Sequence, residues 1–380
     1  MSDSLRSILP PILGPLVPDS FDRPAVDEPR ATCSSCAMCE ESKNLPSPTG
    51  NFRPDAKCCT FHPALPNYLV GGLLSDSDPA LDEGKRRVRE KIANRIGVTP
   101  QWISPPRKLR VYLEAARNMG VFGRTRALLC PYYVDESGGS CSVWRYRDAV
   151  CTTYFCKYSH GLRGYAFWTK LKEYLTHVEG LLSKYACATV DPAVAEPQIP
   201  HLKITVEDLE DRPPNDADYA RYWGKWVGKE EAFYLACAEA VRGLGREGFA
   251  RIVDASVTVR DCHAQLMAHY DKIARPDAPA TLVPNPRMRA ANIDGTMAVT
   301  TYNPCDSYGL PKDVYDALQS FEPDVPVKKI VKRLKQKKGI EIGAELLADL
   351  VMHAVLVTPE AAAQARIEDA ATQPPQGAKK

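Results

Sequence analysis

The chain has 380 residues, of which 44% are apolar and 25% are charged, as is ordinary for a soluble globular protein. Its 49 lysines and arginines nearly balance 47 aspartates and glutamates, and the net charge of +2 therefore gives no overall reason to bind nucleic acid or a membrane surface. No run of about 18 apolar residues occurs, which excludes a membrane-spanning helix of the usual kind.

The N-terminal part of the chain is rich in proline. Residues 1–30 are predicted to be an extended segment, because Pro10, Pro11, Pro15 and Pro18 interrupt any α-helix there. The same prolines break the apolar stretch that an export signal would need. We therefore expect a cytoplasmic protein.

Residues 31–189 are predicted to form a cysteine-cluster, metal-binding domain. Two cysteine-rich loops flank helices that apolar spacing predicts over 85–97 and 107–119. The clearest helix of the chain covers 165–186. Its apolar residues recur at steps of three and four and make one stripe, which consists of Trp168, Leu171, Leu175, Val178, Leu182 and Tyr185.

The second half of the chain is divided by two proline-containing segments, 190–201 and 275–286, which we interpret as linkers. Between them, residues 202–274 are predicted to be a helical domain. Trp223, Trp226, Phe233 and Val241 are its expected core residues.

Residues 286–358 are predicted to be a winged-helix-like module, because a hairpin is followed by three amphipathic helices. The hairpin turns on Asp294-Gly295, a strong two-residue turn signal. The low-complexity residues 359–380 are predicted to be a disordered tail. The predicted fold class is thus mainly α with cysteine-rich, metal-bound loops (α+β) and a C-terminal winged-helix-like module.

The chain contains 13 cysteines, an odd number, and in a reducing compartment clustered cysteines are more often metal ligands or catalytic groups than disulfides. Nine of them fall into two groups on either side of the helices at 85–119, and we predict these nine as the metal ligands: Cys33, Cys36, Cys39, Cys58, Cys59, Cys130, Cys141, Cys151 and Cys156. The loops that carry them hold little apolar material. We therefore expect both groups to converge on a metal that takes the place of a core.

The remaining four, Cys187, Cys237, Cys262 and Cys305, do not share this spacing, and Cys237 is most simply a core residue. Two metals fit the nine clustered thiols. Three cysteines at successive Cys-x2-Cys spacings, Cys33, Cys36 and Cys39, are typical of an iron–sulfur run, whereas zinc takes four nitrogen or sulfur ligands in a tetrahedron. Arg147 would neutralise a thiolate cluster, or it is an ordinary surface arginine.

The second group resembles the signature of the YkgJ-type cysteine-cluster family, which is described as zinc- or iron-chelating. Cys130-Pro131-Tyr132-Tyr133 is followed by Cys141-Ser142-Val143-Trp144, and Arg147, Cys151, Phe155 and Cys156 complete the pattern. Asp148 stands where the family usually has proline, and the doublet Cys58-Cys59 comes later than usual, which leaves open which of the two ligates. The resemblance implies a chelating module, and some relatives point to a 4Fe–4S cluster.

The C-terminal module is similar in pattern to PqqD-like peptide-binding modules, in which a peptide adds a strand to a sheet edge. Its second helix, within 326–339, carries seven lysines and arginines and no acidic residue. Such a helix is a solvated face, a docking surface for a protein or peptide, or a DNA-binding helix.

These patterns predict a metal-binding protein, with an iron–sulfur cluster or zinc, that has an accessory or redox role in a modification pathway and recruits a protein or peptide partner through 286–358. The alternative is a metal- or redox-sensing regulator that binds DNA. An enzyme with an open coordination position on its cluster is a third hypothesis. Signature motifs of nucleotide-binding proteins, zinc proteases and serine hydrolases are absent from the sequence.

Overall fold

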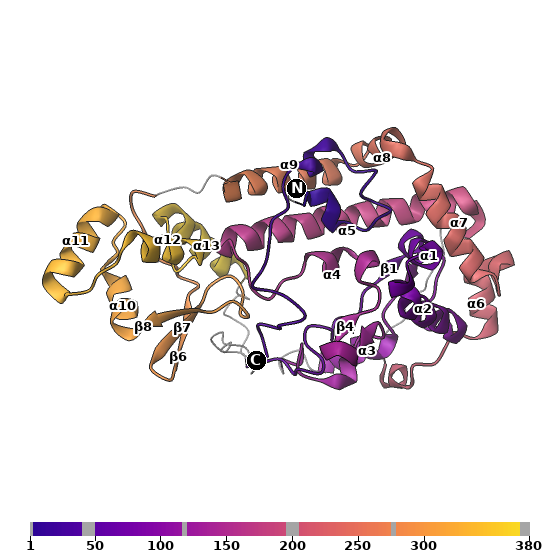
Figure 1. The fold of residues 1–380 in the computed structure, drawn as a ribbon, viewed down its shortest axis with the longest axis horizontal. Coiled ribbons are helices and arrows are strands. Elements are labelled where there is room, and N and C mark those ends of the chain that lie inside the picture. The colour runs from indigo at the N-terminus through magenta and orange to yellow at the C-terminus, as the bar shows by residue number, and fades with distance from the viewer. Residues whose placement is uncertain (1–2, 40–49, 116–119, 195–204, 275–278, 373–380) are drawn as a thin grey trace, which may run out of the picture.

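The computed structural model describes residues 3–39, 50–115, 120–194, 205–274 and 279–372. Within these ranges the chain is mainly helical and its sheets are small, in agreement with the mainly α class predicted from the sequence. Figure 1 shows a large helical part on the right and a smaller C-terminal part on the left, and α5 runs through the larger part from the boundary between the two.

The helices of the larger part are α1 (Asn67–Ser75), α2 (Asp82–Asn94), α3 (Arg107–Ala115), α4 (Ala149–Thr153), α5 (Gly161–Val190), α6 (Asp216–Trp223), α7 (Glu230–Arg242), α8 (Gly245–Asp254) and α9 (Val257–Ala274). Its strands are β1 (Leu65–Pro66), β2 (Trp102–Ile103), β3 (Tyr133–Val134) and β4 (Ser140–Cys141). These strands form two separate antiparallel pairs, β1 with β2 and β3 with β4.

The C-terminal part contains α10 (Lys312–Ala317), α11 (Val327–Lys338), α12 (Ala344–Met352) and α13 (Pro359–Thr372). Its strands are β5 (Val283–Pro284), β6 (Arg289–Ile293), β7 (Thr296–Thr300), β8 (Tyr308–Pro311) and β9 (Leu356–Val357). An antiparallel sheet has the order β6-β7-β8, and β5 pairs with β9.

Helix α5 is the longest element of the described chain, and it contains the whole of the helix predicted over 165–186. Five residues of its predicted stripe are buried: Trp168, Leu171, Leu175, Val178 and Leu182. This stripe packs against α9, α7 and α1, which burial of apolar surface stabilises. Helix α1 in turn lies so close to α7 that a Cβ atom on Gly71 would be 1.9 Å from the Tyr234 carbonyl oxygen, a contact that only glycine permits.

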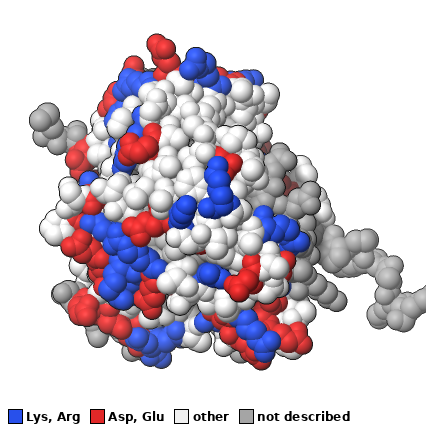
Figure 2. Space-filling model, turned by 90° about the vertical axis from the view of Figure 1, so that its right-hand side faces the viewer, with Lys and Arg blue, Asp and Glu red and all other residues white. Residues whose placement is uncertain are grey.

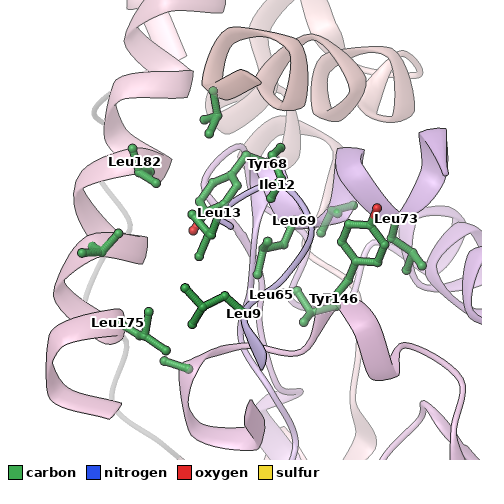
Figure 3. Close-up of a cluster of buried hydrophobic side chains, with 14 of the residues drawn as sticks. Leu9, Ile12, Leu13, Leu65, Tyr68, Leu69, Leu73, Tyr146, Leu175 and Leu182 are labelled. Atoms are coloured by element: carbon green, nitrogen blue, oxygen red, sulfur yellow. The ribbon is translucent and has the colours of Figure 1, made fainter. Parts of the chain in front are cut away.

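The N-terminal segment is not simply extended as predicted from its prolines. It forms two short 3₁₀ helices, Leu5–Ile8 and Asp19–Asp22, which prolines in the flanking turns do not prevent. Figure 3 shows Leu9, Ile12 and Leu13 beside α1 and facing α5, and all three side chains are buried. The apolar residues that resembled a broken signal sequence therefore belong to the protein core.

One hydrophobic core extends from Leu5 to Leu266. It includes Trp223, Phe233 and Val241, and Trp226 packs at its edge. The helices predicted as a separate domain over 202–274 therefore share a core with those of 31–189. The two predicted linkers lie partly on 195–204 and 275–278, outside the described residues.

The C-terminal part has its own core between β7, β8 and helices α10 to α12. The predicted hairpin is present: Ile293 pairs with Thr296 across Asp294-Gly295, and both turn residues have positive φ, as a type I′ turn requires. Residues 359–372, predicted as part of a disordered tail, instead form α13, which Arg287 contacts through ion pairs to Glu368 and Asp369. The remainder of that tail, 373–380, lies outside the described residues.

The C-terminal part meets the larger part at the start of α5. Gly161 has a φ of +52°, and a Cβ atom there would lie 2.1 Å from the carbonyl oxygen of Met352 at the end of α12. A residue other than glycine would force the two elements apart. On the opposite end of the molecule, positive and negative side chains are mixed, with no large patch of one sign (Figure 2). Among the described helices, none combines the length and the apolar character needed to cross a membrane.

Candidate metal centre

A cavity of about 760 Å³ lies between the N-terminal segment, the two cysteine-rich loops and α5. Eight of the nine predicted ligands line it, from both groups: Cys33, Cys36, Cys58, Cys59, Cys130, Cys141, Cys151 and Cys156. The ninth, Cys39, is buried behind the wall and packs in one small cluster with Cys36 and Cys156. Two stretches that are separated by α1, α2 and α3 in the sequence thus share one site.

Backbone and lysine contacts bring the first group to the second. The Cys130 amide donates a hydrogen bond to the Cys59 carbonyl oxygen at 2.8 Å. The buried ammonium of Lys57 donates to the Cys33 carbonyl oxygen at 2.5 Å and also to the carbonyl oxygens of Gly138 and Gly139. A charged donor shared by several carbonyl oxygens thus joins the two loops.

Asp148 holds Cys151 in position. Its Oδ1 accepts a hydrogen bond from the Cys151 amide at 2.9 Å and caps α4, and its Oδ2 accepts from the Ala64 amide at 3.2 Å. Aspartate is a favoured N-cap residue. The residue that departs from the YkgJ pattern therefore has a structural role here, between the two cysteine-bearing loops.

Arg147 lies among the thiols. Its guanidinium stacks on the Trp144 ring, with 3.5 Å between the guanidinium carbon and the ring centroid, and its Nε donates to the Trp144 carbonyl oxygen at 3.0 Å. Burial lowers the pKa of Arg147. Negative charge on nearby sulfurs, when these are deprotonated, opposes this change, and the sulfurs belong to Cys141, Cys151, Cys33 and Cys58. Of the two interpretations of Arg147, the geometry favours the cation that faces the cluster.

Burial dominates the electrostatics of the thiols themselves. It raises the pKa of Cys130 and of Cys156 to about 12, and it raises the pKa of Cys33 and Cys141 as well. These groups are therefore neutral thiols near pH 7 unless a cation is bound. A bound metal reverses this balance, because coordination deprotonates a thiol outright.

The donor set fits a soft metal, since sulfur ligands select zinc, copper(I) and iron–sulfur clusters. Among the described residues, however, no three histidine, cysteine or carboxylate side chains are already arranged to hold one ion. The thiols ring a cavity and do not converge on a point. Such a ring suits a cluster of several irons, because each thiolate then binds a different iron.

The histidines near the cysteine groups do not line the cavity. His62 Nε2 donates to the Leu128 carbonyl oxygen at 3.0 Å, and burial lowers its pKa to about 4, which keeps the ring neutral. His263, next to Cys262 on α9, hydrogen-bonds with the Ser20 hydroxyl at 2.9 Å and stacks on Phe21.

Sequence spacing missed Cys305. The structure buries it in the small cluster that also contains Cys36, Cys39 and Cys156. It comes from the loop between β7 and β8, in the C-terminal part, so no spacing within 31–160 could have indicated it.

Comparisons of the chain with protein-family models, with curated proteins and with solved structures found no match.

Proposed function

We propose that the chain is a metalloprotein whose two cysteine-rich loops bind an iron–sulfur cluster or zinc, and that it has an accessory or redox role in a modification pathway. The observation that supports this most is that eight thiols from two distant stretches line a single cavity. Unrelated buried cysteines would not be expected to gather in this way.

The thiols nearest Arg147 are the proposed ligands of this centre: Cys33, Cys58, Cys141 and Cys151, with Cys59 and Cys130 beside them. An iron–sulfur cluster bound there would supply one-electron transfer, and zinc would supply structural support. Arg147 offsets the negative charge of the thiolates. Ile8, Leu9 and Trp168 cover the cavity with apolar surface and limit the access of water.

The resemblance to the YkgJ-type family agrees with this proposal, because the residues that carry it are the cavity-lining Cys130, Cys141, Cys151 and Cys156. In this proposal both members of the doublet Cys58-Cys59 are available as ligands. Cys58 and Cys59 both line the cavity, and Cys58 also touches the small cluster around Cys156.

The C-terminal part is proposed to act as a winged-helix-like, partner-binding module. Strand β6 is the outer strand of the sheet β6-β7-β8, and no other described strand pairs with its free edge. A peptide of a protein partner could add a strand there, as the pattern similar to PqqD-like modules implies. The experiment is a pull-down with the full chain and with Ala290→Pro, which removes a backbone donor from the outer edge of β6, because Ala290 is not in a hydrogen-bonded pair with β7.

One observation favours the alternative, a DNA-binding regulator. On α11, Arg333 and Lys335 pair with Glu322 and Glu341, but five exposed lysines have no acidic partner among the described residues: Lys328, Lys329, Lys332, Lys337 and Lys338. Such lysines are able to contact phosphates. A gel shift at about 50 mM salt decides this point, because phosphate contacts are strongest at low salt. Absence of binding there removes the regulator.

The central experiment is anaerobic purification of the full chain, with measurement of iron, zinc and acid-labile sulfide per chain and an absorbance spectrum. The proposal expects stoichiometric metal, and it is falsified if neither iron nor zinc is present. Cys141→Ser should lower the metal content. Cys262→Ser is the matched control, because Cys262 is also buried but lies on α9 and does not line the cavity.

A further inference from the structure

The ten cysteines at or behind the cavity fall into two sets. One set surrounds Arg147, as described above. The other is a cluster in which Cys39, Cys156 and Cys305 are buried with Ala37, Met38 and Phe52, and the partly buried Cys36 packs against them. Cys58 packs at the boundary between the sets.

Cys305 reaches this second set through a dedicated group of hydrogen bonds. Asn303 Nδ2 donates to the Cys156 carbonyl oxygen at 3.2 Å, while Asn303 Oδ1 accepts from the Cys305 amide at 2.9 Å. The buried Lys157 ammonium donates to the Cys305 carbonyl oxygen at 3.2 Å. One asparagine and one lysine thus hold the two cysteine-bearing segments side by side.

The buried carboxylate of Asp306 also holds the segment around Cys305 against the segment that follows Cys156. Asp306 accepts a hydrogen bond from the Tyr158 amide at 3.0 Å and from the Tyr302 hydroxyl at 2.6 Å. Arg30 pairs with it at 3.2 Å, and the Asp306 side chain is fully buried. A buried charge is retained only when it is well satisfied, and here its partners come from the N-terminal segment and the segment after Cys156.

Burial raises the pKa of the Cys305 thiol, so that without a metal it is neutral, as are the buried thiols of Cys130 and Cys156. A hydrogen bond with Tyr154 and the positive charges of Arg124 and Lys157 oppose this rise. Hydrogen bonds and cations around a ligating sulfur stabilise its charged form and orient it toward a metal.

We propose that Cys36, Cys39, Cys156 and Cys305 form a second, four-thiolate metal centre, distinct from the centre beside Arg147. Four cysteines are the usual ligand set both of zinc in structural sites and of iron–sulfur clusters. The proposal rests on the proposed function in one respect, that the chain binds a soft metal through thiolates. It adds a ligand from the C-terminal part, so that the metal would join the two parts of the molecule.

Rotation of cysteine side chains is required for closure on a metal, since no three such ligands among the described residues already converge. Space for this exists, because Cys36 and Cys156 open on the 760 Å³ cavity.

The test compares iron, zinc and sulfide per chain in full-length wild type, Cys305→Ser and Cys156→Ser, all purified anaerobically. Two centres predict that Cys305→Ser and Cys156→Ser each lose the second centre and keep the one beside Arg147. A variant that carries both substitutions should lose no more metal than either single variant, because both residues serve the same site. Cys141→Ser should remove the other centre. Iron with sulfide identifies a cluster, and zinc alone identifies a zinc site.

Two outcomes overturn the second centre alone: Cys305→Ser with wild-type metal content, or complete loss of metal in Cys141→Ser. Wild-type protein without metal overturns the proposed function as well. If Cys305→Ser does not fold, the wild-type protein is treated stepwise with a chelator, and the metal remaining per chain is measured after each step. Two centres predict loss in two phases, with the environment of Tyr302 changing in one of them; a single phase contradicts the proposal.

Discussion

Helix α5 and the cysteine-rich loops border the same cavity but are stabilised by different means. In α5, Phe167, Leu171 and Val178 are fully buried against neighbouring helices. In the loops, β3 and β4 have two residues each. Tyr132, Val143 and Tyr146 reach the same core, and Lys57 and Asp148 add polar contacts. The comparison teaches that the helical core is stabilised by burial alone, whereas the loops combine burial with a few polar contacts and, under the proposed function, with a bound metal.

Under the proposed function, removal of the metal should cause the largest difference between the two regions, which is a difference in amide hydrogen exchange. If the loops depend on the metal, exchange of the Cys130 amide, which donates to Cys59, should accelerate on the order of a thousandfold after chelation, since metal binding energy is folding energy for such loops. Amides in the middle of α5 should keep their protection. Hydrogen exchange with and without chelator measures both, and equal behaviour of the two regions would refute the comparison.

The next largest effect is expected for the close packing of α1 against α7, and it is a loss of stability. Gly71→Ala places a methyl group 1.9 Å from the Tyr234 carbonyl oxygen and should lower the free energy of unfolding by about 3 kcal/mol. Urea denaturation followed by circular dichroism measures this. Gly180→Ala is the control within α5: no atom lies within 4 Å of its added Cβ, and it should stabilise the protein by about 1 kcal/mol. Similar effects of both changes would mean that α1 and α7 do not pack closely.

Lys57 tests the polar contacts of the loops. Lys57→Met leaves three carbonyl oxygens without their charged donor and should cost about 2 kcal/mol, confined to the loops. Limited proteolysis should show faster cleavage near 50–60, while the unfolding of α5 is unchanged. Lys328→Met, at an exposed position of α11, is the control and should have no effect. Global destabilisation by Lys57→Met would show that the loops and the core unfold together.

Glu179 gives an effect that is seen only as a pH dependence. It is fully buried on α5, and burial raises its pKa well above the usual value of 4.5. The folded protein therefore binds a proton that the unfolded chain has lost, and stability should fall as the pH rises above 4.5. Glu179→Gln should remove this decrease, as thermal unfolding between pH 5 and pH 8 would show. A decrease of equal size in the variant would assign the pH dependence to other groups.

The parts of the fold that the sequence predicts are those governed by local rules. The stripe of α5 follows helical periodicity, and the Asp294-Gly295 hairpin follows turn chemistry. The N-terminal segment and α13 were predicted less well. Prolines indicate where an α-helix cannot form, but they do not indicate whether the apolar residues between them, such as Leu13, find a core.

In the candidate site, too, local spacing predicts some residues, whereas others depend on contacts between distant parts of the chain. Spacing indicates Cys130, Cys141 and Cys151 because they lie in one short segment. It does not indicate Cys305, whose place beside Cys156 depends on the docking of the C-terminal part through Asp306 and Asn303. Contacts between residues far apart in the sequence leave no periodic or spacing signal.

The close approach of Gly161 to Met352 has a mechanical consequence. Helix α5 has 30 residues and is therefore a stiff rod about 45 Å long. Its first turn touches the end of α12, and Trp168, two turns further on, lines the cavity. Any force that displaces α12 is transmitted along this rod, and the cavity wall at Trp168 shifts with it.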